Sequence, residues 1–262
     1  MSINADVRPS PPTLHVLGVP GLPDVEAGDD LAGLITKAVR AVPLEVAGGD
    51  VFVITQKVVS KTEGRLVRLD TVEPSALARQ WSAVGGKDPR VVELTLREAV
   101  RIVRMDRGVL IAETRHGLVC ANAGVDTSNV PDGWAALLPE DPDASARRIR
   151  DGLSAAFGGA VAVIVTDTFG RPWREGQINV AIGLAGLSPI LDYRGRTDAH
   201  GHRLQATAIA VADELASAAE LVMGKTRGVP VAVVKGAGEL GLIIGDGSAR
   251  DLCRRPEEDL FR

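Results

Sequence analysis

Cysteine and aromatic side chains are scarce in this chain of 262 residues. Its two cysteines, Cys120 and Cys253, stand far apart and have no metal-ligand spacing. Cysteine this sparse predicts reduced thiols in a cytoplasmic protein. Aromatic residues make up 3% of the sequence, so the core must be built from Val, Leu, Ile and Ala. A chain of this length buries roughly three-quarters of its unfolded surface, so it needs neither a disulfide nor a metal to hold it together.

Long apolar runs and a surplus of basic residues are also missing. No uninterrupted apolar run approaches the roughly 20 residues of a membrane span, and the N-terminal MSINADVRPSPP has no apolar signal core. The net charge of -4 argues against a general nucleic-acid binder. Hydrophobic residues at 45% and charged residues at 24% are typical of a soluble globular protein. We therefore expect a cytoplasmic protein that binds neither nucleic acid nor membrane, with a mobile N-terminus at residues 1–12.

Patterns typical of strands and of helices are mixed along the chain. Apolar or alternating runs predict strands at residues 13–19, 51–55, 161–165 and 229–238, and paired strands with turns between 101 and 129. Helical periodicity predicts helices at residues 31–42, 141–158 and 207–224, and a helix, a break and a second helix over 79–100. Hairpins together with crossovers indicate the α+β class (mixed α/β), with mixed sheets and flanking helices. We expect one domain over 13–250, with a sub-domain insert at about 73–100, and a charged tail over 251–262.

The usual phosphate-binding signatures are not convincing here. The sequence contains no G-x-x-x-x-G-K-[ST]. Residues 236–241 spell G-x-G-x-x-G after an expected strand, but the following LIIGDGSAR is broken by glycines and makes a poor start for a helix. In GGDVFVIT the glycines precede the strand, which is the wrong order for a dinucleotide-binding turn. A nucleotide site in this chain would therefore be built differently.

Two polar clusters follow apolar runs, where α/β proteins tend to place ligands. The first, at residues 56–61, contains Lys57 and Lys61, which suit phosphate oxygens; the alternative is a solvated loop after the strand. The second, at residues 126–129, places a carboxylate beside hydroxyls and an amide. Such oxygen ligands suit Mg²⁺ or Mn²⁺, although the same residue types also favour a turn.

The third cluster, VTDTFGRPWREGQ, is the most unusual stretch. A buried strand is expected to end at Asp167 and Thr168, and a turn then brings in cations. The first two side chains could hold a divalent ion that bridges phosphates. Arg171 and Arg174 could each bind a phosphate or carboxylate group through two parallel hydrogen bonds. The alternative is a helix cap followed by surface arginines.

Several segments together resemble one family, the coenzyme F420-0:L-glutamate ligases (gamma-glutamyl ligases). They include ITQKVVSK, AGVDTSNV, TDTFGRPWREGQ and PVAVVKG, and they run in the family's order from about Leu14 to about Gly236. The most specific element is T-D-T-x-G-R-x-W-R. The chain is similar to the N-terminal ligase domain of the actinobacterial bifunctional enzyme, in which a nitroreductase-type flavin domain follows. It is thus either a free-standing ligase or the ligase half of a longer protein.

The resemblance implies a GTP-dependent acid–amino-acid ligase. In the family, GTP activates a carboxylate of the deazaflavin precursor F420-0 as an acyl phosphate, and the amine of L-glutamate then attacks, releasing GDP and phosphate. The implied cofactors are Mg²⁺ or Mn²⁺, with K⁺ as a further candidate cation. A homodimer is also implied, and the apolar stretch at residues 180–193 is either its interface or part of the monomer core. Two other functions stay open, a metal-dependent phosphotransferase or hydrolase and a non-catalytic GTP-binding partner domain.

The resemblance also assigns residues. Asp126 and Asp167 would hold a divalent metal, Thr168 a second ion, and Arg171 and Arg174 the anionic substrate or the transferring phosphate. The nucleotide would contact Leu22, Pro23, Asp24, Val25, Gln56, Lys61, Asn129, Met223, Gly224 and Lys225. Many similar proteins carry Gln or Glu where this chain has lysine at position 225. A lysine ammonium has no lone pair for a metal, so either the second metal site is altered or this lysine contacts phosphate.

Overall fold

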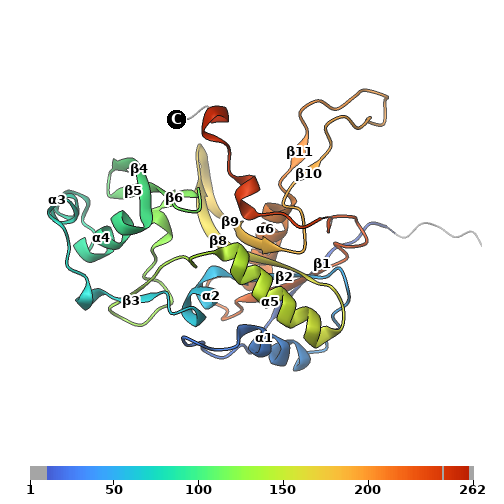
Figure 1. The fold of residues 1–262 in the computed structure, drawn as a ribbon, viewed down its shortest axis with the longest axis horizontal. Helices are drawn as coiled ribbons and strands as arrows, with labels where there is room; N and C mark the ends of the chain where they lie inside the picture. Colours follow the sequence, from blue (N-terminus) through green and yellow to red (C-terminus); the bar gives the residue numbers. More distant parts are fainter. Residues whose placement is uncertain (1–10, 244, 260–262) are drawn as a thin grey trace, which may run out of the picture.

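A five-stranded sheet forms the centre of the computed structural model, which describes residues 11–243 and 245–259 (Figure 1). We call it the main sheet, and its order is β1 (His15–Val19), β12 (Val231–Lys235), β2 (Val51–Thr55), β8 (Ala162–Arg171) and β9 (Arg174–Ala185). β2 and β8 pair in parallel, whereas the other neighbours are antiparallel. The apolar runs of β2 and β8 are buried because helices cover both faces of the sheet. The predicted mixed sheet with flanking helices is confirmed.

The helices lie on opposite faces of the main sheet. On one face, α1 (Leu31–Arg40) and α5 (Pro142–Phe157) pack on alternate strand residues such as Phe52 and Val163. On the other face, α6 (Val211–Met223) packs on the intervening residues such as Val53. The apolar residues in the last part of β9, from Ala181 to Ala185, are also buried in these clusters, so this part of the stretch at 180–193 belongs to the monomer core.

A second group of elements, residues 66–136, lies to one side of the main sheet, at the left of Figure 1; we call it the side lobe. It has two small sheets, β3–β7 and β4–β5–β6, and its own apolar clusters. Its elements are β3 (Leu66–Arg68), η1 (Leu69–Thr71), α3 (Ala76–Gly85), α4 (Pro89–Glu98), β4 (Ala99–Asp106), β5 (Val109–Thr114), β6 (Val119–Ala121), η2 (Asn122–Gly124) and β7 (Trp134–Ala136). The predicted helix, break and helix are confirmed, since Gly86 ends α3 at a φ of 69°.

The remaining elements complete the chain. They are α2 (Gln56–Thr62), the ribbon β10 (Leu191–Asp192) with β11 (Ala208–Ile209), and the short helices η3 (Ala249–Leu252) and η4 (Pro256–Glu258). The predicted mobile segment 1–12 lies, except for its last two residues, outside the described residues. Among the described residues, none of the helices is long and apolar enough to cross a membrane.

Two local expectations were wrong. The strand expected to end at Asp167 and Thr168 continues to Arg171, because β9 pairs with it residue by residue. The stretch after β2 is the helix α2 rather than a loop. At residues 236–241 no helix follows β12; the Leu240 amide donates to the Gly236 carbonyl in a turn, as expected for a chance G-x-G-x-x-G match.

Candidate functional site

Three parts of the chain meet where β2 ends. Thr55, the last residue of β2, pairs with Thr166, so β8 and β9 continue beyond this point as a two-stranded ribbon that begins with Asp167. The helix α2 starts at the same edge and supplies Lys57. The side lobe supplies Asp126, whose backbone pairs with Ala136 of β7. Residues distant in the sequence thereby share one end of the main sheet.

Asp126 is held by a lysine and by its own turn. The ammonium of Lys57 donates to its Oδ2 at 2.7 Å and to the Ser128 carbonyl at 2.6 Å. The backbone amide of Ser128 donates to Oδ1 and its hydroxyl to Oδ2, both at 2.8 Å. Burial acts to raise the pKa of Asp126, but these hydrogen bonds outweigh it and the pKa is lowered. Residues 126–129 therefore form the turn that their composition favours, and the turn presents an ionised carboxylate.

Asp167 lies in a different electrostatic environment. Burial raises the pKa of its carboxyl to about 6, and the charge of Asp126 acts in the same direction. The charges of Lys57 and Lys225 act to lower the pKa. The two carboxylates are therefore close enough to interact, with two ammonium groups around them.

A hydrogen-bonded chain links Thr168 to the end of α6. Lys225 donates to the Thr168 hydroxyl, which donates to the side-chain carbonyl of Asn179 at 2.7 Å. The Asn179 amide donates to Glu220 at 3.0 Å, and this glutamate lies 3.7 Å from the Lys225 ammonium. The lysine thus contacts the hydroxyl that the resemblance assigns to a second ion.

The donor set at this edge suits a hard cation. Two carboxylates and a hydroxyl are oxygen ligands of the kind that Mg²⁺ and Mn²⁺ prefer, and a partly buried carboxylate such as Asp167 is stabilised by a nearby positive charge. The described residues contain no group of three or more His, Cys, Asp or Glu side chains that could hold a metal ion. A metal here would depend on the aspartate pair, hydroxyls and ligands from outside the chain.

The residues assigned to the nucleotide differ widely in exposure. Pro23, Asp24 and Asn129 are exposed, and Lys61 is half-buried. The side chains of Val25 and Met223 pack in the core, as Gln56 also does while accepting a hydrogen bond from Ser60 at 2.8 Å. These three buried side chains would support a nucleotide site indirectly, because their packing fixes the position of the backbone around it. Leu22 packs against the same core, and Gly224 follows α6 at a φ of 62°. Their contact with a nucleotide stays a prediction.

The two arginines of the third cluster lie at the tip of the β8–β9 hairpin. Arg171 pairs with Arg174 across the turn, where Trp173 is 82% exposed at a φ of 58°. One guanidinium nitrogen of Arg171 donates to the Glu175 carbonyl at 2.8 Å, which orients the side chain. At a rise of about 3.3 Å per residue, Arg171 stands roughly 10 Å from Thr168 along the strand. The arginines would therefore contact a different part of a long substrate from the aspartates.

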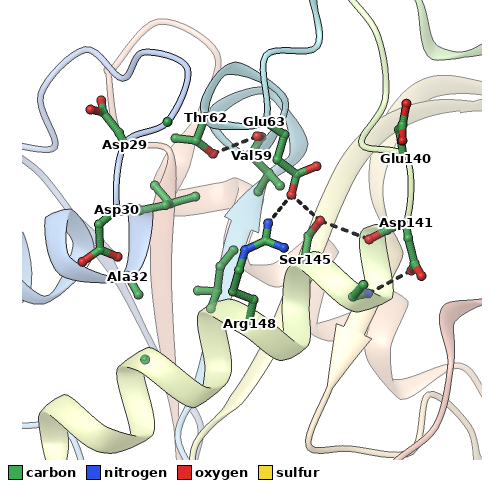
Figure 2. A pocket seen from close by; sticks show the side chains of 15 residues that line it. Asp29, Asp30, Ala32, Val59, Thr62, Glu63, Glu140, Asp141, Ser145 and Arg148 are labelled. Atoms are coloured by element: carbon green, nitrogen blue, oxygen red, sulfur yellow. Dashed lines mark hydrogen bonds and ion pairs between the residues drawn. The ribbon is translucent and has the colours of Figure 1, made fainter.

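Two cavities border these elements. The larger, of 620 Å³, lies between α1, α2 and α5 (Figure 2). In it, Glu63 accepts hydrogen bonds from Arg148 and Ser145, and the other charged lining residues are carboxylates. Because carboxylates repel phosphate, this cavity is a poor triphosphate site. Sequence reasoning missed it, since its walls come from three separate helices.

The second cavity, of 470 Å³, lies beside Asp126 and Thr127. It is lined by parts of the side lobe, among them Lys87 and Asn122. Sequence reasoning missed Lys87, and the only signal was its position in the GGKDP break between two helices.

Comparisons with known proteins agree with the resemblance carried by the motifs. The family model described as F420-0:Gamma-glutamyl ligase matches residues 21–236. The coenzyme F420:L-glutamate ligase of Methanothermobacter thermautotrophicus is 47% identical over 250 residues, which cover 95% of this chain and 99% of the relative. The protein of the same name from Methanopyrus kandleri is 49% identical over 253 residues, or 96% and 98% of the two chains. A third, from Methanocaldococcus jannaschii, is 40% identical over 250 residues, or 95% and 97%.

Proposed function

The chain belongs to the F420-0:gamma-glutamyl ligase family, and from this membership we propose that it joins L-glutamate to a coenzyme F420 precursor through an amide bond, and that further additions lengthen a gamma-linked glutamyl tail. Relatives that match nearly the whole chain are named coenzyme F420:L-glutamate ligases, which supports a ligase activity. The observation that carries the proposal further is the meeting of Asp126, Asp167 and two lysines at one end of the main sheet. Such a mixture of carboxylates and cations suits phosphoryl chemistry.

The reaction has two steps in this proposal. A carboxylate oxygen of F420-0 attacks the γ-phosphorus of GTP, so a carboxyl O–P bond forms, the bridging P–O bond breaks and GDP leaves. The amine of L-glutamate then attacks the carbonyl carbon of the acyl phosphate. The C–N bond forms, the C–O bond to phosphate breaks, and the amine loses a proton as phosphate departs. The protein must align these groups, neutralise phosphoryl charge and exclude water.

The residues divide this work. Asp126 and Asp167 would hold a divalent cation, with the Thr168 hydroxyl beside them for a second ion. A divalent cation supplies positive charge against the phosphate oxygens. Lys225, at the end of α6, would place its ammonium on the nucleotide phosphates, next to the predicted contacts from α2. Arg171 and Arg174 would bind the anionic deazaflavin substrate from the hairpin tip.

Product analysis separates this function from the alternatives. The protein is incubated with F420-0, GTP, L-glutamate and Mn²⁺ or Mg²⁺, and the deazaflavin is analysed by mass spectrometry. A ligase adds glutamyl residues and releases GDP only when glutamate is present. A phosphotransferase or hydrolase releases GDP without glutamate, and a GTP-binding partner domain binds GTP without turnover.

The aspartate pair provides the matching variants. Asp126→Ala and Asp167→Ala should each lower glutamylation at least about 100-fold, because the phosphoryl charge is no longer neutralised. Circular dichroism should show an unchanged fold. Near-normal turnover by either variant would contradict the metal assignment. Replacing K⁺ by Na⁺ in the assay and measuring the mass in solution test the predicted K⁺ and the predicted homodimer.

A further inference from the structure

Lys87 occupies an unusual position in the cavity beside Asp126. It lies in the short connection between α3 and α4, and its ammonium donates to the Asn122 side-chain carbonyl at 2.6 Å. The same ammonium lies 5.9 Å from the centre of the Trp81 ring. Neither partner is an anion. Burial lowers the pKa of Lys87, as expected for a cation that is partly withdrawn from water.

Three carboxylates line the cavity; Asp88 and Asp126 are already engaged, and the third, Asp132, is exposed. Asp88 caps α4 and binds the guanidinium of Arg90, with its Oδ2 at 2.6 Å from Nη2. Asp126 binds the ammonium of Lys57 at 2.7 Å. Among the described residues, Lys87 therefore has no ion pair, although it lines a cavity with several polar atoms. A partly desolvated cation without a counter-charge favours an anionic ligand.

We propose that this cavity binds the incoming amino acid and that Lys87 binds one of its carboxylates. The inference rests on the proposed ligase function, because that function requires an acidic amino acid beside the site of carboxylate activation. The cavity borders Asp126 directly, so an amino acid held by Lys87 would lie beside the carboxylate that is proposed to hold the metal. Its volume of 470 Å³ lies in the usual range for small-molecule sites and exceeds what one amino acid needs. A cation at this place favours amino acids that carry a second carboxylate in the side chain.

Steady-state kinetics of Lys87→Met test the proposal. Methionine keeps the length of the side chain and removes the charge, so the KM for L-glutamate should rise about tenfold or more. The KM values for GTP and for F420-0 should stay within about twofold, because neither substrate contacts Lys87. Lys87→Arg should recover part of the loss. Lys235→Met is the control for removal of a lysine charge elsewhere, since Lys235 pairs with Asp50 near the opposite end of β2, and it should leave the KM for glutamate unchanged.

Direct binding keeps this inference separate from the proposed function. L-glutamate is titrated by calorimetry into the wild-type protein and into both Lys87 variants, with GDP and Mn²⁺ present. Binding by the wild type that weakens about tenfold in Lys87→Met supports the cavity even without turnover. An unchanged affinity and KM in a folded Lys87→Met variant would overturn it, as would a loss confined to the KM for GTP. Absence of any glutamylated product would instead refute the ligase function.

Discussion

At the scale of single residues, Lys57 acts as a built-in counter-ion for Asp126. Its side chain is only 16% exposed and makes three hydrogen bonds, to the Asp126 carboxylate and to the carbonyl and hydroxyl of Ser128. A cation proposed to bind the same carboxylate must compete with this ammonium. The lysine and the metal therefore each weaken the other's interaction with Asp126. This gives a prediction with a definite sign.

We predict that Lys57→Met binds Mn²⁺ more tightly than the wild type, roughly tenfold, because a competing charge is removed. The metal-free variant should unfold more easily, by about 1–2 kcal/mol, since Asp126 loses its ion pair but remains partly solvated. Calorimetric titration of Mn²⁺ and urea unfolding measure the two effects. Lys235→Met, which breaks a remote ion pair of the same 2.7 Å length, should lower stability without changing metal affinity. Weaker Mn²⁺ binding in Lys57→Met would mean that the lysine positions Asp126 for the metal instead.

Asp167 gives a prediction about pH. Its pKa is raised from 3.8 to about 6 in the folded protein, so folding favours the protonated carboxyl. The stability that this group contributes is fully present below pH 3.8 and is lost as the pH rises through about 6. In the presence of a chelator, we compare the free energy of unfolding of the wild type with that of Asp167→Asn. Between pH 3.8 and pH 7, the wild type should lose up to about 3 kcal/mol relative to this variant. Urea unfolding of both proteins from pH 4 to pH 8 measures the difference. Parallel stability curves would show that burial does not disfavour the charge.

At the scale of elements, the sequence predicted most strands and helices because each carries a local signal. Strand β2 reads as an apolar run between glycines and a polar segment, and α5 has Asp141 as a cap that accepts from the Ala144 amide. The helix α2 was missed because its seven residues have no side-chain cap and include adjacent β-branched valines. The continuation of β8 was missed because polar residues there suggested an end, whereas pairing with β9 across the hairpin extends the strand to Arg171.

The β8–β9 hairpin gives the prediction at this scale. Its tip places Arg174 at the end of a ribbon that has left the main sheet, roughly 10 Å beyond Thr168. We predict that Arg174→Ala raises the KM for the deazaflavin substrate about tenfold and leaves the KM for GTP unchanged, because one charge-assisted hydrogen bond is lost. Arg203→Ala removes an exposed arginine from a different loop and should change neither value. Equal losses for both substrates would place the hairpin tip on the nucleotide instead.

At the scale of the whole molecule, the candidate site depends on how distant segments meet. The residue types of the site could be singled out from sequence, because carboxylates and hydroxyls after apolar runs stand out. Their grouping was implied only by the family resemblance, since Asp126 belongs to the side lobe and Asp167 to the main sheet, and no local pattern encodes that contact. The cavity that contains Lys87 could not be predicted from the sequence for the same reason. It forms only when the connection between α3 and α4 packs beside η2 and the loop before β7.

Because its two carboxylates come from different parts of the molecule, a shared cation would tie the side lobe to the main sheet. We predict that Mn²⁺ at 100 times its Kd stabilises the protein by about 2.7 kcal/mol and raises the unfolding midpoint by about 5–10 °C. Hydrogen exchange should slow at Asp126 and Ala136, whose backbones pair beside the site. In Asp167→Asn both effects should shrink strongly, although Asp126 and its lysine remain. A full thermal shift in that variant would show that Mn²⁺ binds elsewhere and that the aspartate pair does not join the two parts.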